Sequence, residues 1–322
     1  MLALPPMAGR KESRVQRLGH YLSYLVVRVV ICAAQALSLS TCHTAARGLA
    51  FLFNDVLRIR GKVVEENLRH AFTEWSPAWR RRLARRMWEH LFLFAVEVAH
   101  TSRKIHGSNW RRHIRMGDAQ SEAALVRCVL DDRPLIMVAS HFGNFELAGY
   151  ILALLGYPVH TVARTLDNPF LDRFVNTFRG STGQKILSKR GDLDKITDVL
   201  AGGGIMTFVA DQYAGRKGCW VDFFSRPASA HKAIAILSLE HEAPLLVGHC
   251  RRVGGPLQYE LHVTGVADPS SGDSHASGVR ELTEWYTRQF EEKIRQSPEQ
   301  YWWLHRRWKD NRPKRRSRAK AA

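Results

Sequence analysis

The stretch PLIMVASHFGNFE, residues 134–146, decides the fold class of this chain. Residues 135–139 form a short, uninterrupted apolar run, which is typical of a strand buried on both faces of a parallel sheet. Residues 148–155 then follow a helical pattern, and Gly156-Tyr157-Pro158 predicts the turn that ends this helix. A buried strand followed directly by a helix favours an α/β fold.

The alternation of strands and helices continues towards the C-terminus. Four further apolar runs predict strands, at 159–163, 205–210, 244–250 and 259–263. The segments between and after them predict helices, at 170–180, 192–201, 230–241 and 279–296. Residues 134–308 are therefore predicted to form an α/β core with a mostly parallel central sheet flanked by helices.

Residues 44–133 are predicted to be helical. Within 77–100, apolar residues recur at spacings of three and four and mark one helical face: Leu83, Met87, Leu91, Phe94 and Val98. We assign 44–308 to one domain, and we expect the basic tail at 309–322 to be disordered.

The composition is that of a globular protein with an unusual charge. Of 322 residues, 45% are hydrophobic and 24% are charged, which excludes wholesale disorder. The 48 Lys+Arg against 30 Asp+Glu give a net charge of +18. Residues 58–115 hold 14 Lys/Arg and 5 Asp/Glu, and residues 305–322 hold 9 Lys/Arg and one acid. This charge implies a polyanionic partner, which is a nucleic acid, an anionic membrane surface, or an acidic or phosphorylated substrate.

Residues 1–43 are predicted to be a basic flank and a membrane-anchoring helix. The apolar stretch at 21–42 would form a helix about 33 Å long, which is enough to cross a hydrocarbon core of ~30 Å. Arg28 and Gln35 interrupt it and, seven residues apart, share one helical face, so the helix either spans the membrane or lies in its interface. A buried core helix is the alternative that needs no membrane. Four basic residues precede the stretch: Arg10, Lys11, Arg14 and Arg17.

Several site chemistries lack the motifs that they require. Five cysteines are scattered through the chain: Cys32, Cys42, Cys128, Cys219 and Cys250. They show no Cys-x-x-Cys spacing, which argues against a disulfide framework and a zinc finger and favours a reducing compartment. The chain contains no G-x-S-x-G, Walker or H-E-x-x-H motif, so a serine-hydrolase elbow, a phosphate-binding loop and a zinc-protease helix are not expected.

Three polar residues of different chemistry follow the first three predicted strands of the core. They are His141, Arg164 and Asp211. Parallel strands deliver their carboxyl ends to one edge of a sheet, and ligands bind at this edge. The sequence therefore predicts that a base, a permanent cation and a carboxylate gather there.

The segment 141–146 adds a second carboxylate close to the histidine. Gly143 permits a tight turn, and Glu146 falls in the first turn of the next helix. We predict that Glu146 accepts a hydrogen bond from one imidazole nitrogen of His141, so that the other nitrogen can accept a substrate proton. A substrate hydroxyl then serves as the nucleophile. The alternative is a structural histidine, with Glu146 stabilising the start of the helix.

His141-x-x-x-x-Glu146 resembles the H-x4-D/E signature of the glycerolipid and lysophospholipid acyltransferase superfamily. The wider pattern, over roughly residues 20–310, is similar to the late acyltransferases of bacterial lipid A biosynthesis. An ordered set of segments carries this resemblance: Arg60 with 63–72, 140–146, 163–164 with 167–169, 210–212, 223–224 with 227–228, and 298–309. The chain departs from the family at Ser225, where glycine is usual, and at His231-Lys232, where small or hydroxyl residues and glycine are expected.

The resemblance implies an acyltransferase domain at 44–308. It implies transfer of a fatty acyl chain, from the thioester of an acyl carrier protein or coenzyme A, to a hydroxyl of a lipid A precursor or related glycolipid. His141 would be the general base and Glu146 its partner. Four residues would bind substrate or support the transition state: Arg164, Asp211, Asn144 and Gln212. The reaction needs neither a metal ion nor a bound cofactor, and related branches acylate lysophospholipids, phosphatidylinositol mannosides or amino-acid-derived lipids.

The resemblance also implies a location and a set of partners. The enzyme would work at the cytoplasmic face of the bacterial inner membrane, with an acidic acyl carrier protein, a phosphorylated lipid acceptor and an anionic membrane surface as partners. The aromatic residues Tyr301, Trp302, Trp303 and Trp308 would then form a belt at headgroup level, with packing in the core as the alternative for Trp302 and Trp303. A basic nucleic-acid-binding protein is the alternative from another class, but it explains neither the anchor nor the residues at the strand ends, so nucleic acid is not an expected partner.

Overall fold

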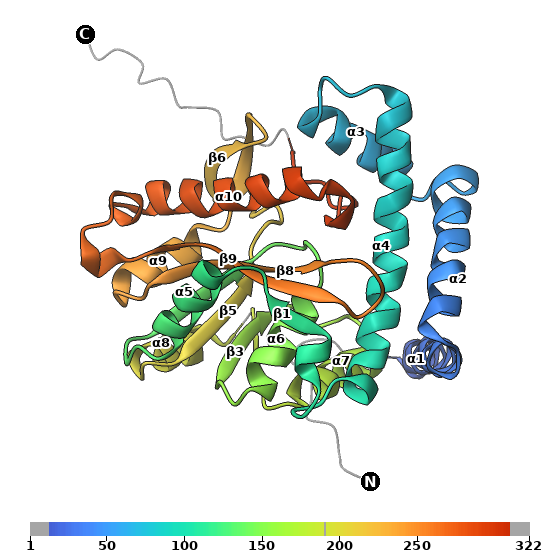
Figure 1. Cartoon of the computed structure of the whole chain (residues 1–322), viewed down its shortest axis with the longest axis horizontal. Helices are drawn as coiled ribbons and strands as arrows, with labels where there is room; N and C mark the ends of the chain where they lie inside the picture. The colour runs from blue at the N-terminus through green and yellow to red at the C-terminus, as the bar shows by residue number, and fades with distance from the viewer. Residues whose placement is uncertain (1–12, 190, 310–322) are drawn as a thin grey trace.

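The computed structural model describes residues 13–189 and 191–309, and at its centre is a seven-stranded sheet (Figure 1). The strand order is β1-β9-β8-β2-β5-β3-β4. The strands are β1 (Ile114–Met116), β2 (Leu135–Ala139), β3 (Val159–Ala163), β4 (Lys185–Ser188), β5 (Ile205–Val209), β8 (Leu245–Arg252) and β9 (Tyr259–Ala267). All run parallel except β1 and β9, which run in the opposite direction. The predicted α/β fold with a mostly parallel central sheet is confirmed.

Helices cover both faces of this sheet. They are α5 (Ala119–Val129), α6 (Phe145–Leu154), α7 (Pro169–Gly180), α8 (Leu193–Ala201), α9 (Lys232–Glu240) and α10 (Val279–Gln296). Leu135 and Met137 of β2 pack in one cluster with residues of α5 and α6, whereas Ile136 and Val138 pack in another with residues of α8, α9 and α10. Burial on both faces explains why β2 is apolar at every position.

The structure contains four short strands that the sequence pattern does not predict. β1 and β4 have only three and four residues, and a second, two-stranded sheet is formed by β6 (Cys219–Phe223) and β7 (Arg226–Ala230). Phe224 and Ser225 make the turn between β6 and β7 with φ angles of 52° and 55°. This is the left-handed region that favours glycine, so Ser225 keeps a backbone turn that glycine usually makes in the family.

The N-terminal part of the chain is a helical layer beside the sheet. It consists of α1 (Arg14–Ala36), α2 (Leu39–Phe51), a π-helical turn η1 (Leu52–Val56), α3 (Gly61–Ala71) and α4 (Pro77–Lys104). The long helix α4 begins at a strong signal, because the Ser76 hydroxyl accepts from the Trp79 backbone N–H at 3.3 Å and Pro77 occupies the first turn. α2 and α4 lie side by side (Figure 1). The boundary predicted between residues 43 and 44 falls inside α2.

The prediction of one helix over 21–42 is wrong in its bounds. α1 spans 23 residues and ends at Ala36, and Ser38 then caps α2 by accepting from the Thr41 backbone N–H at 3.1 Å. Gln35 donates to the Ala99 carbonyl of α4 at 2.6 Å, and the Arg28 guanidinium lies 4.9 Å from the Phe174 ring of α7. The polar face of α1 therefore turns towards the domain.

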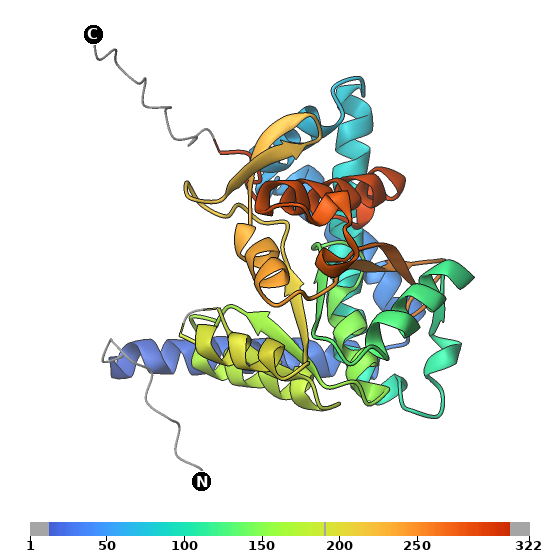
Figure 2. The same ribbon diagram turned by 90° about the vertical axis from the view of Figure 1, so that its left-hand side faces the viewer.

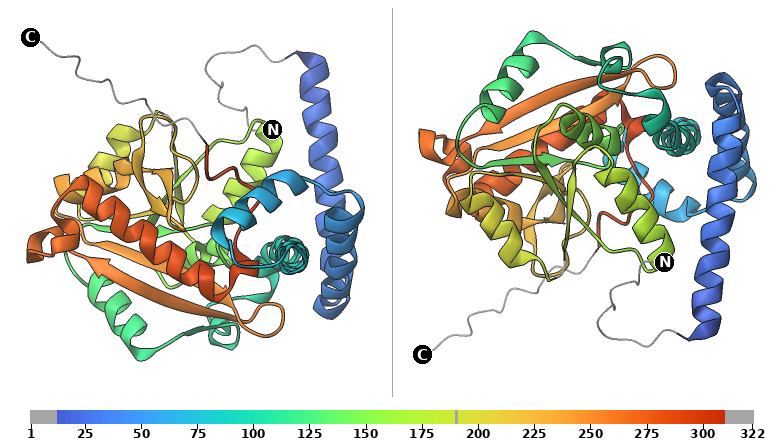
Figure 3. Two further views of the ribbon diagram at one scale, coloured as in Figure 1. Left: turned by 90° about the horizontal axis from the view of Figure 1, so that it is seen from above. Right: turned by 90° about the horizontal axis from the view of Figure 1, so that it is seen from below.

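Several apolar residues of α1 lie on its outer side, whereas Tyr24, Val27 and Ile31 are partly buried. Val26, Val29 and Val30 are each more than 60% exposed, and no residue of α1 is buried, so the alternative of a core helix is wrong. Figures 2 and 3 show α1 running along one side of the domain. By length and composition α1 is able to cross a membrane.

Four short 3₁₀ turns occur along the described chain, at η2 (Trp110–Arg112), η3 (Pro269–Ser271), η4 (Ser274–Ala276) and η5 (Pro298–Gln300).

The C-terminal segment is packed into the domain. After η5, the buried Asn67 side chain donates to the carbonyls of Trp303 and His305, both at 2.7 Å. Tyr301, Trp303 and Trp308 are buried in the core, so the predicted aromatic belt is wrong for these three residues, and the alternative of core packing is confirmed for Trp303. The predicted tail lies, apart from Lys309, outside the described residues.

Candidate active site

The three residues at the strand ends meet at one edge of the sheet. Strand β5 lies between β2 and β3, and all three run parallel. Ala139 of β2 pairs with Val209 of β5, and His141 and Asp211 lie two residues further along each strand. Arg164 follows β3 at the same edge. The structure thus brings together the base, the carboxylate and the cation that sequence analysis places there.

Asp211 is the carboxylate that contacts His141. His141 Nδ1 lies 2.6 Å from Asp211 Oδ1, and the Tyr301 hydroxyl donates a second hydrogen bond to Asp211. Burial acts to raise the pKa of Asp211, but the positive charge of His141 and the hydrogen bonds from His141 and Tyr301 outweigh it and lower this pKa to about 2. Asp211 therefore remains an ionised acceptor throughout the physiological range of pH.

The second imidazole nitrogen of His141 is oriented as a base. Because the carboxylate of Asp211 accepts at Nδ1, we assign the proton of the neutral ring to Nδ1 and a lone pair to Nε2. The amide nitrogen of Gln212 lies 3.4 Å from Nε2, and both residues line a cavity in the domain. A substrate hydroxyl in this cavity can therefore reach a nitrogen that is ready to accept its proton.

Arg164 lies at the wall of the same cavity but is much more exposed than His141. Its side chain is 75% exposed, and it donates to Asp167, 3.1 Å away, whose side chain is also exposed. An ion pair between two exposed groups is weak. Arg164 is therefore able to exchange Asp167 for an anionic group of a substrate.

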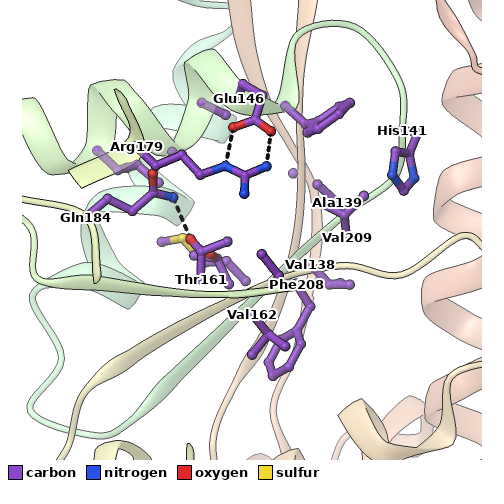
Figure 4. Close-up of a pocket in the computed structure, with 18 of the residues that line it drawn as sticks. Val138, Ala139, His141, Glu146, Thr161, Val162, Arg179, Gln184, Phe208 and Val209 are labelled. Carbon is purple, nitrogen blue, oxygen red and sulfur yellow. Dashed lines mark hydrogen bonds and ion pairs between the residues drawn. The ribbon is translucent and has the colours of Figure 1, made fainter. Parts of the chain in front are cut away.

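The predicted contact between His141 and Glu146 is wrong. Glu146 lines the cavity from the first turn of α6, but its carboxylate accepts two hydrogen bonds from Arg179 of α7, one of them at 2.9 Å from Arg179 Nε. Figure 4 shows this pair and the His141 ring apart from it. Sequence proximity suggests Glu146 as the partner, whereas the pairing of β2 with β5 places Asp211 beside the imidazole. The catalytic role of Glu146 stays a prediction.

Asn144 positions the loop between β2 and α6. It is fully buried, its side-chain oxygen accepts from the Leu147 backbone N–H at 3.0 Å, and its amide donates to the Tyr259 hydroxyl at 3.2 Å. Asn144 is not among the residues that line the cavity and instead caps α6, so its role in binding substrate or supporting the transition state stays a prediction. Gly143, with φ +61°, allows the loop to approach β8, because a Cβ there would lie 1.9 Å from the Cys250 carbonyl oxygen.

A buried ion pair beneath this loop is invisible in the sequence pattern. Glu97 of α4 is fully buried and accepts from Arg252 of β8, at 3.0 Å from Nε, and from the Tyr259 hydroxyl. Arg252 also donates to His90 Nδ1 at 2.7 Å, and His90 Nε2 donates to the Gly143 carbonyl at 3.2 Å. Burial and the charge of Arg252 hold the pKa of His90 well below its usual range. These residues are far apart in sequence, and the local signal is a single acid, Glu97, within the otherwise apolar run 91–99.

The cavity has a volume of about 450 Å³ and extends from His141 between the sheet and α6. Apolar side chains make up the larger part of its lining, among them Met137 from β2, Leu152 from α6 and Leu246 from β8. This is a space of the size and polarity that an extended hydrocarbon chain fills. Among the described residues, no group of three or more His, Cys, Asp or Glu side chains has the arrangement of a metal site.

Sequence comparisons place these residues in a known family. The sequence pattern of the family "Bacterial lipid A biosynthesis acyltransferase" matches residues 9–310. The lipid A biosynthesis lauroyltransferase of Escherichia coli K12 is 25% identical over 297 residues, which cover 90% of this chain and 92% of the relative. The lipid A biosynthesis palmitoleoyltransferase of the same organism is 25% identical over 260 residues, covering 79% and 80%.

More distant likenesses extend to other acyltransferases. The phosphatidylinositol mannoside acyltransferase of Mycobacterium tuberculosis H37Rv is 26% identical over 178 residues, covering 54% of each chain. Among solved structures, the 1-acyl-sn-glycerophosphate acyltransferase PlsC of Thermotoga maritima is 13% identical, with a TM-score of 0.35, covering 86% of this chain and 97% of that one.

Proposed function

The chain belongs to the bacterial lipid A biosynthesis acyltransferase family and is an acyltransferase, and we propose that it transfers a fatty acyl chain from a thioester to a hydroxyl of a lipid A precursor or related glycolipid. The donor in this proposal is an acyl carrier protein or coenzyme A thioester. One observation carries the proposal: an Asp211-paired His141 borders a cavity whose lining is more apolar than polar. A base beside a space for a hydrocarbon chain suits acyl transfer.

The reaction needs one base and no protein nucleophile. His141 Nε2 accepts the proton of the acceptor hydroxyl while the hydroxyl oxygen attacks the thioester carbonyl carbon. A C–O bond forms and the C–S bond breaks. The proton then passes from the imidazolium to the departing thiolate. Asp211 stabilises the imidazolium that forms between these two steps, as a buried carboxylate does beside a catalytic histidine.

Arg164, Gln212 and Glu146 support the reaction from the cavity wall. Arg164 binds a phosphate of the acceptor or the negative charge that develops on the carbonyl oxygen, and its exposed pairing with Asp167 is easily exchanged. The Gln212 amide orients the group that approaches His141 Nε2. Glu146 and Arg179 form part of the cavity wall and give it its shape.

The enzyme in this proposal lies on the cytoplasmic face of the inner membrane. The exposed apolar side of α1, with Val26, Val29 and Val30, supports contact with a bilayer. The polar residues of α1 contact the domain instead, which favours a helix that lies in the membrane interface. The acidic acyl carrier protein and an anionic lipid surface would both be attracted by a net charge of +18.

Lipid mass spectrometry tests the proposed reaction. Cells that express the chain should contain a lipid A precursor or related glycolipid heavier by one acyl chain than cells that lack it, and the mass difference identifies the chain. His141→Ala should abolish this product, because it removes the base that Asp211 orients at the cavity. His275→Ala, which changes an exposed histidine outside the cavity, should leave it unchanged. Full product formation by His141→Ala would refute the mechanism, and an acylated lysophospholipid or inositol mannoside would redirect the acceptor.

A further inference from the structure

The basic segment at 103–115 contributes nothing to the active site described above. Its sequence, RKIHGSNWRRHIR, contains five Lys/Arg and no Asp or Glu, and none of these residues lines the catalytic cavity. The segment connects the end of α4, through η2, to the edge strand β1. A concentration of positive charge that catalysis does not use needs another anionic partner.

A second cavity lies at this segment. Its volume is about 370 Å³, and we call it the arginine pocket. One wall comes from η2 and β1, and the other from the turn that joins β8 to β9. The residues that matter for its chemistry are Arg111, Arg112, Arg115, Gly254, Gly255 and Gln258. No Asp or Glu lines the pocket.

The charges of the arginine pocket are incompletely neutralised. Within residues 13–189 and 191–309, neither Arg111 nor Arg112 has a carboxylate partner, and the Arg111 guanidinium lies 4.6 Å from the Trp110 ring. Arg115 donates to Glu260 at 2.8 Å, but Arg251 shares the same carboxylate, also at 2.8 Å. The guanidinium fork suits the oxygens of a phosphate, so the pocket has the charge and the donors to bind one.

The segment that carries the arginine pocket is linked to the N-terminal helices α1 and α2 by shared packing and one hydrogen bond. Trp110, which stacks on Arg111, and Leu39, at the start of α2, pack against the same buried cluster. At the other end of the basic segment, Arg103 donates to Gln35 of α1 at 3.3 Å. The segment that carries the pocket therefore contacts the C-terminal end of α1, the helix whose exposed side is apolar, and basic residues that flank such a helix suit anionic headgroups.

We propose that the arginine pocket binds a phosphate group carried by a membrane lipid. Its concave shape and its place on a segment that contacts α1 favour a lipid headgroup over the flat face of an acidic protein. Two lipids carry the required chemistry: an anionic phospholipid of the bilayer, and the phosphorylated acceptor of the reaction. The second source rests on the proposed function, whereas the first does not.

Vesicle binding by the full chain tests the bilayer source. The double variant Arg111→Gln/Arg112→Gln removes two exposed charges, and Arg280→Gln/Arg288→Gln removes two exposed charges from α10, away from α1. With 4:1 phosphatidylcholine and phosphatidylglycerol vesicles, the pocket variant should bind about 20-fold more weakly than wild type. The α10 variant should bind as wild type does, and vesicles of phosphatidylcholine alone should show no difference among the three proteins.

Kinetics in neutral-detergent micelles, which contain no anionic bilayer, test the acceptor source. If the pocket holds the acceptor, the pocket variant should show about a 20-fold higher KM for the phosphorylated acceptor at unchanged kcat. Its KM for the dephosphorylated acceptor should equal that of wild type. The vesicle assay needs no acyl transfer, so failure of the proposed reaction leaves this proposal open to test.

A positive result in either assay supports the proposal and identifies the lipid. Equal vesicle binding and equal acceptor KM for the pocket and α10 variants would overturn it. A higher KM for an acyl carrier protein donor, with both lipid measurements unchanged, would also overturn it and assign the pocket to the acidic protein. Thermal unfolding of both variants should match wild type, because all four arginines are exposed.

Discussion

Two carboxylates, Asp211 and Glu146, lie at the catalytic cavity or beside it, and they have different partners. Asp211 pairs with the imidazole of His141, whereas Glu146 pairs with the guanidinium of Arg179. An imidazole can gain and lose a proton near neutral pH, whereas a guanidinium is a permanent cation. Only the Asp211 pair can therefore serve as a general base, and the Glu146 pair instead shapes and charges the cavity wall.

The comparison shows that a carboxylate acquires its role from the side chain it meets. Glu146 is five residues from His141 in sequence, and Asp211 is seventy residues away. The distant residue makes the contact because β2 and β5 are neighbours in register. The following variants test how far the two pairs differ, in order of expected effect.

Asp211→Asn should have the largest effect. The change removes the negative charge that fixes the Nδ1 proton of His141 and stabilises its imidazolium, so kcat should fall about 10³- to 10⁴-fold. Steady-state kinetics with purified enzyme measure it, and KM should change little. A larger fall in kcat for Glu146→Gln than for Asp211→Asn would reverse the assignment of the two carboxylates.

A third pair, Glu97 with Arg252, is more deeply buried than the other two and reaches no cavity. Glu97→Gln should lower the free energy of unfolding by about 3–5 kcal/mol, because it leaves Arg252 charged and buried without its partner. Thermal unfolding measures the loss. Glu89→Gln, on the same helix with the more exposed His43 and Arg47 as partners, is the matched control and should cost about 1 kcal/mol. Equal losses would show that burial does not set the difference.

Glu146→Gln should have a smaller effect on catalysis. Arg179 then loses its charged partner in the cavity wall, and kcat/KM should fall about 30-fold, mostly through KM. The double variant Glu146→Gln/Arg179→Met removes both charges and should recover part of the loss. If the double variant is as impaired as the sum of the single variants, the two side chains do not act as a pair.

His249 offers the comparison of an imidazole without a carboxylate. It lines the cavity and stacks on His262, with ring centres 5.0 Å apart. Burial first, and then the charge of His262, lower the pKa of His249 to about 3. Its contribution to stability is therefore complete above the unfolded pKa of about 6.5 and is lost as pH falls towards 3.

His249→Asn should reduce the acid sensitivity of the fold. Wild type should lose about 2 kcal/mol through this group between pH 6.5 and pH 5, and the variant should lose none of it. Thermal midpoints at pH 7 and pH 5 measure the difference, with the exposed His275→Asn as control. An unchanged difference in the variant would show that His249 does not carry this pH dependence.

Much of the fold follows from local sequence. β2, β3 and α10 have the bounds that the apolar patterns predict, because each buries a continuous run or a regular face. The sequence pattern does not predict β1 and β4, because these strands are too short to show a hydrophobic period. It also gives the wrong bounds for the helix predicted over 21–42. There, α1 ends at Ala36, and Ser38 caps the start of α2. A single capping serine is a weaker sequence signal than the apolar run around it.

The candidate site is predictable only in part. His141, Arg164 and Asp211 are found because each follows a strand, and strand ends are local features. Arg179, Tyr301, Glu97 and Arg252 are missed because their roles depend on contacts between segments far apart in the chain. Asn144 is assigned to substrate although it caps α6, since a capping residue and a binding residue look alike in sequence.

The sequence by itself determined the α/β class, the edge at which the site lies, the excess of positive charge and the apolar N-terminal helix. These follow from periodicity and composition, which need no knowledge of distant contacts. Only the tertiary structure decided which carboxylate holds His141, which way α1 turns its polar face, and where the basic segment forms a pocket. The physical reason is that hydrogen bonds and ion pairs act over a few ångströms, and the register of strands and the packing of helices decide which side chains come that close.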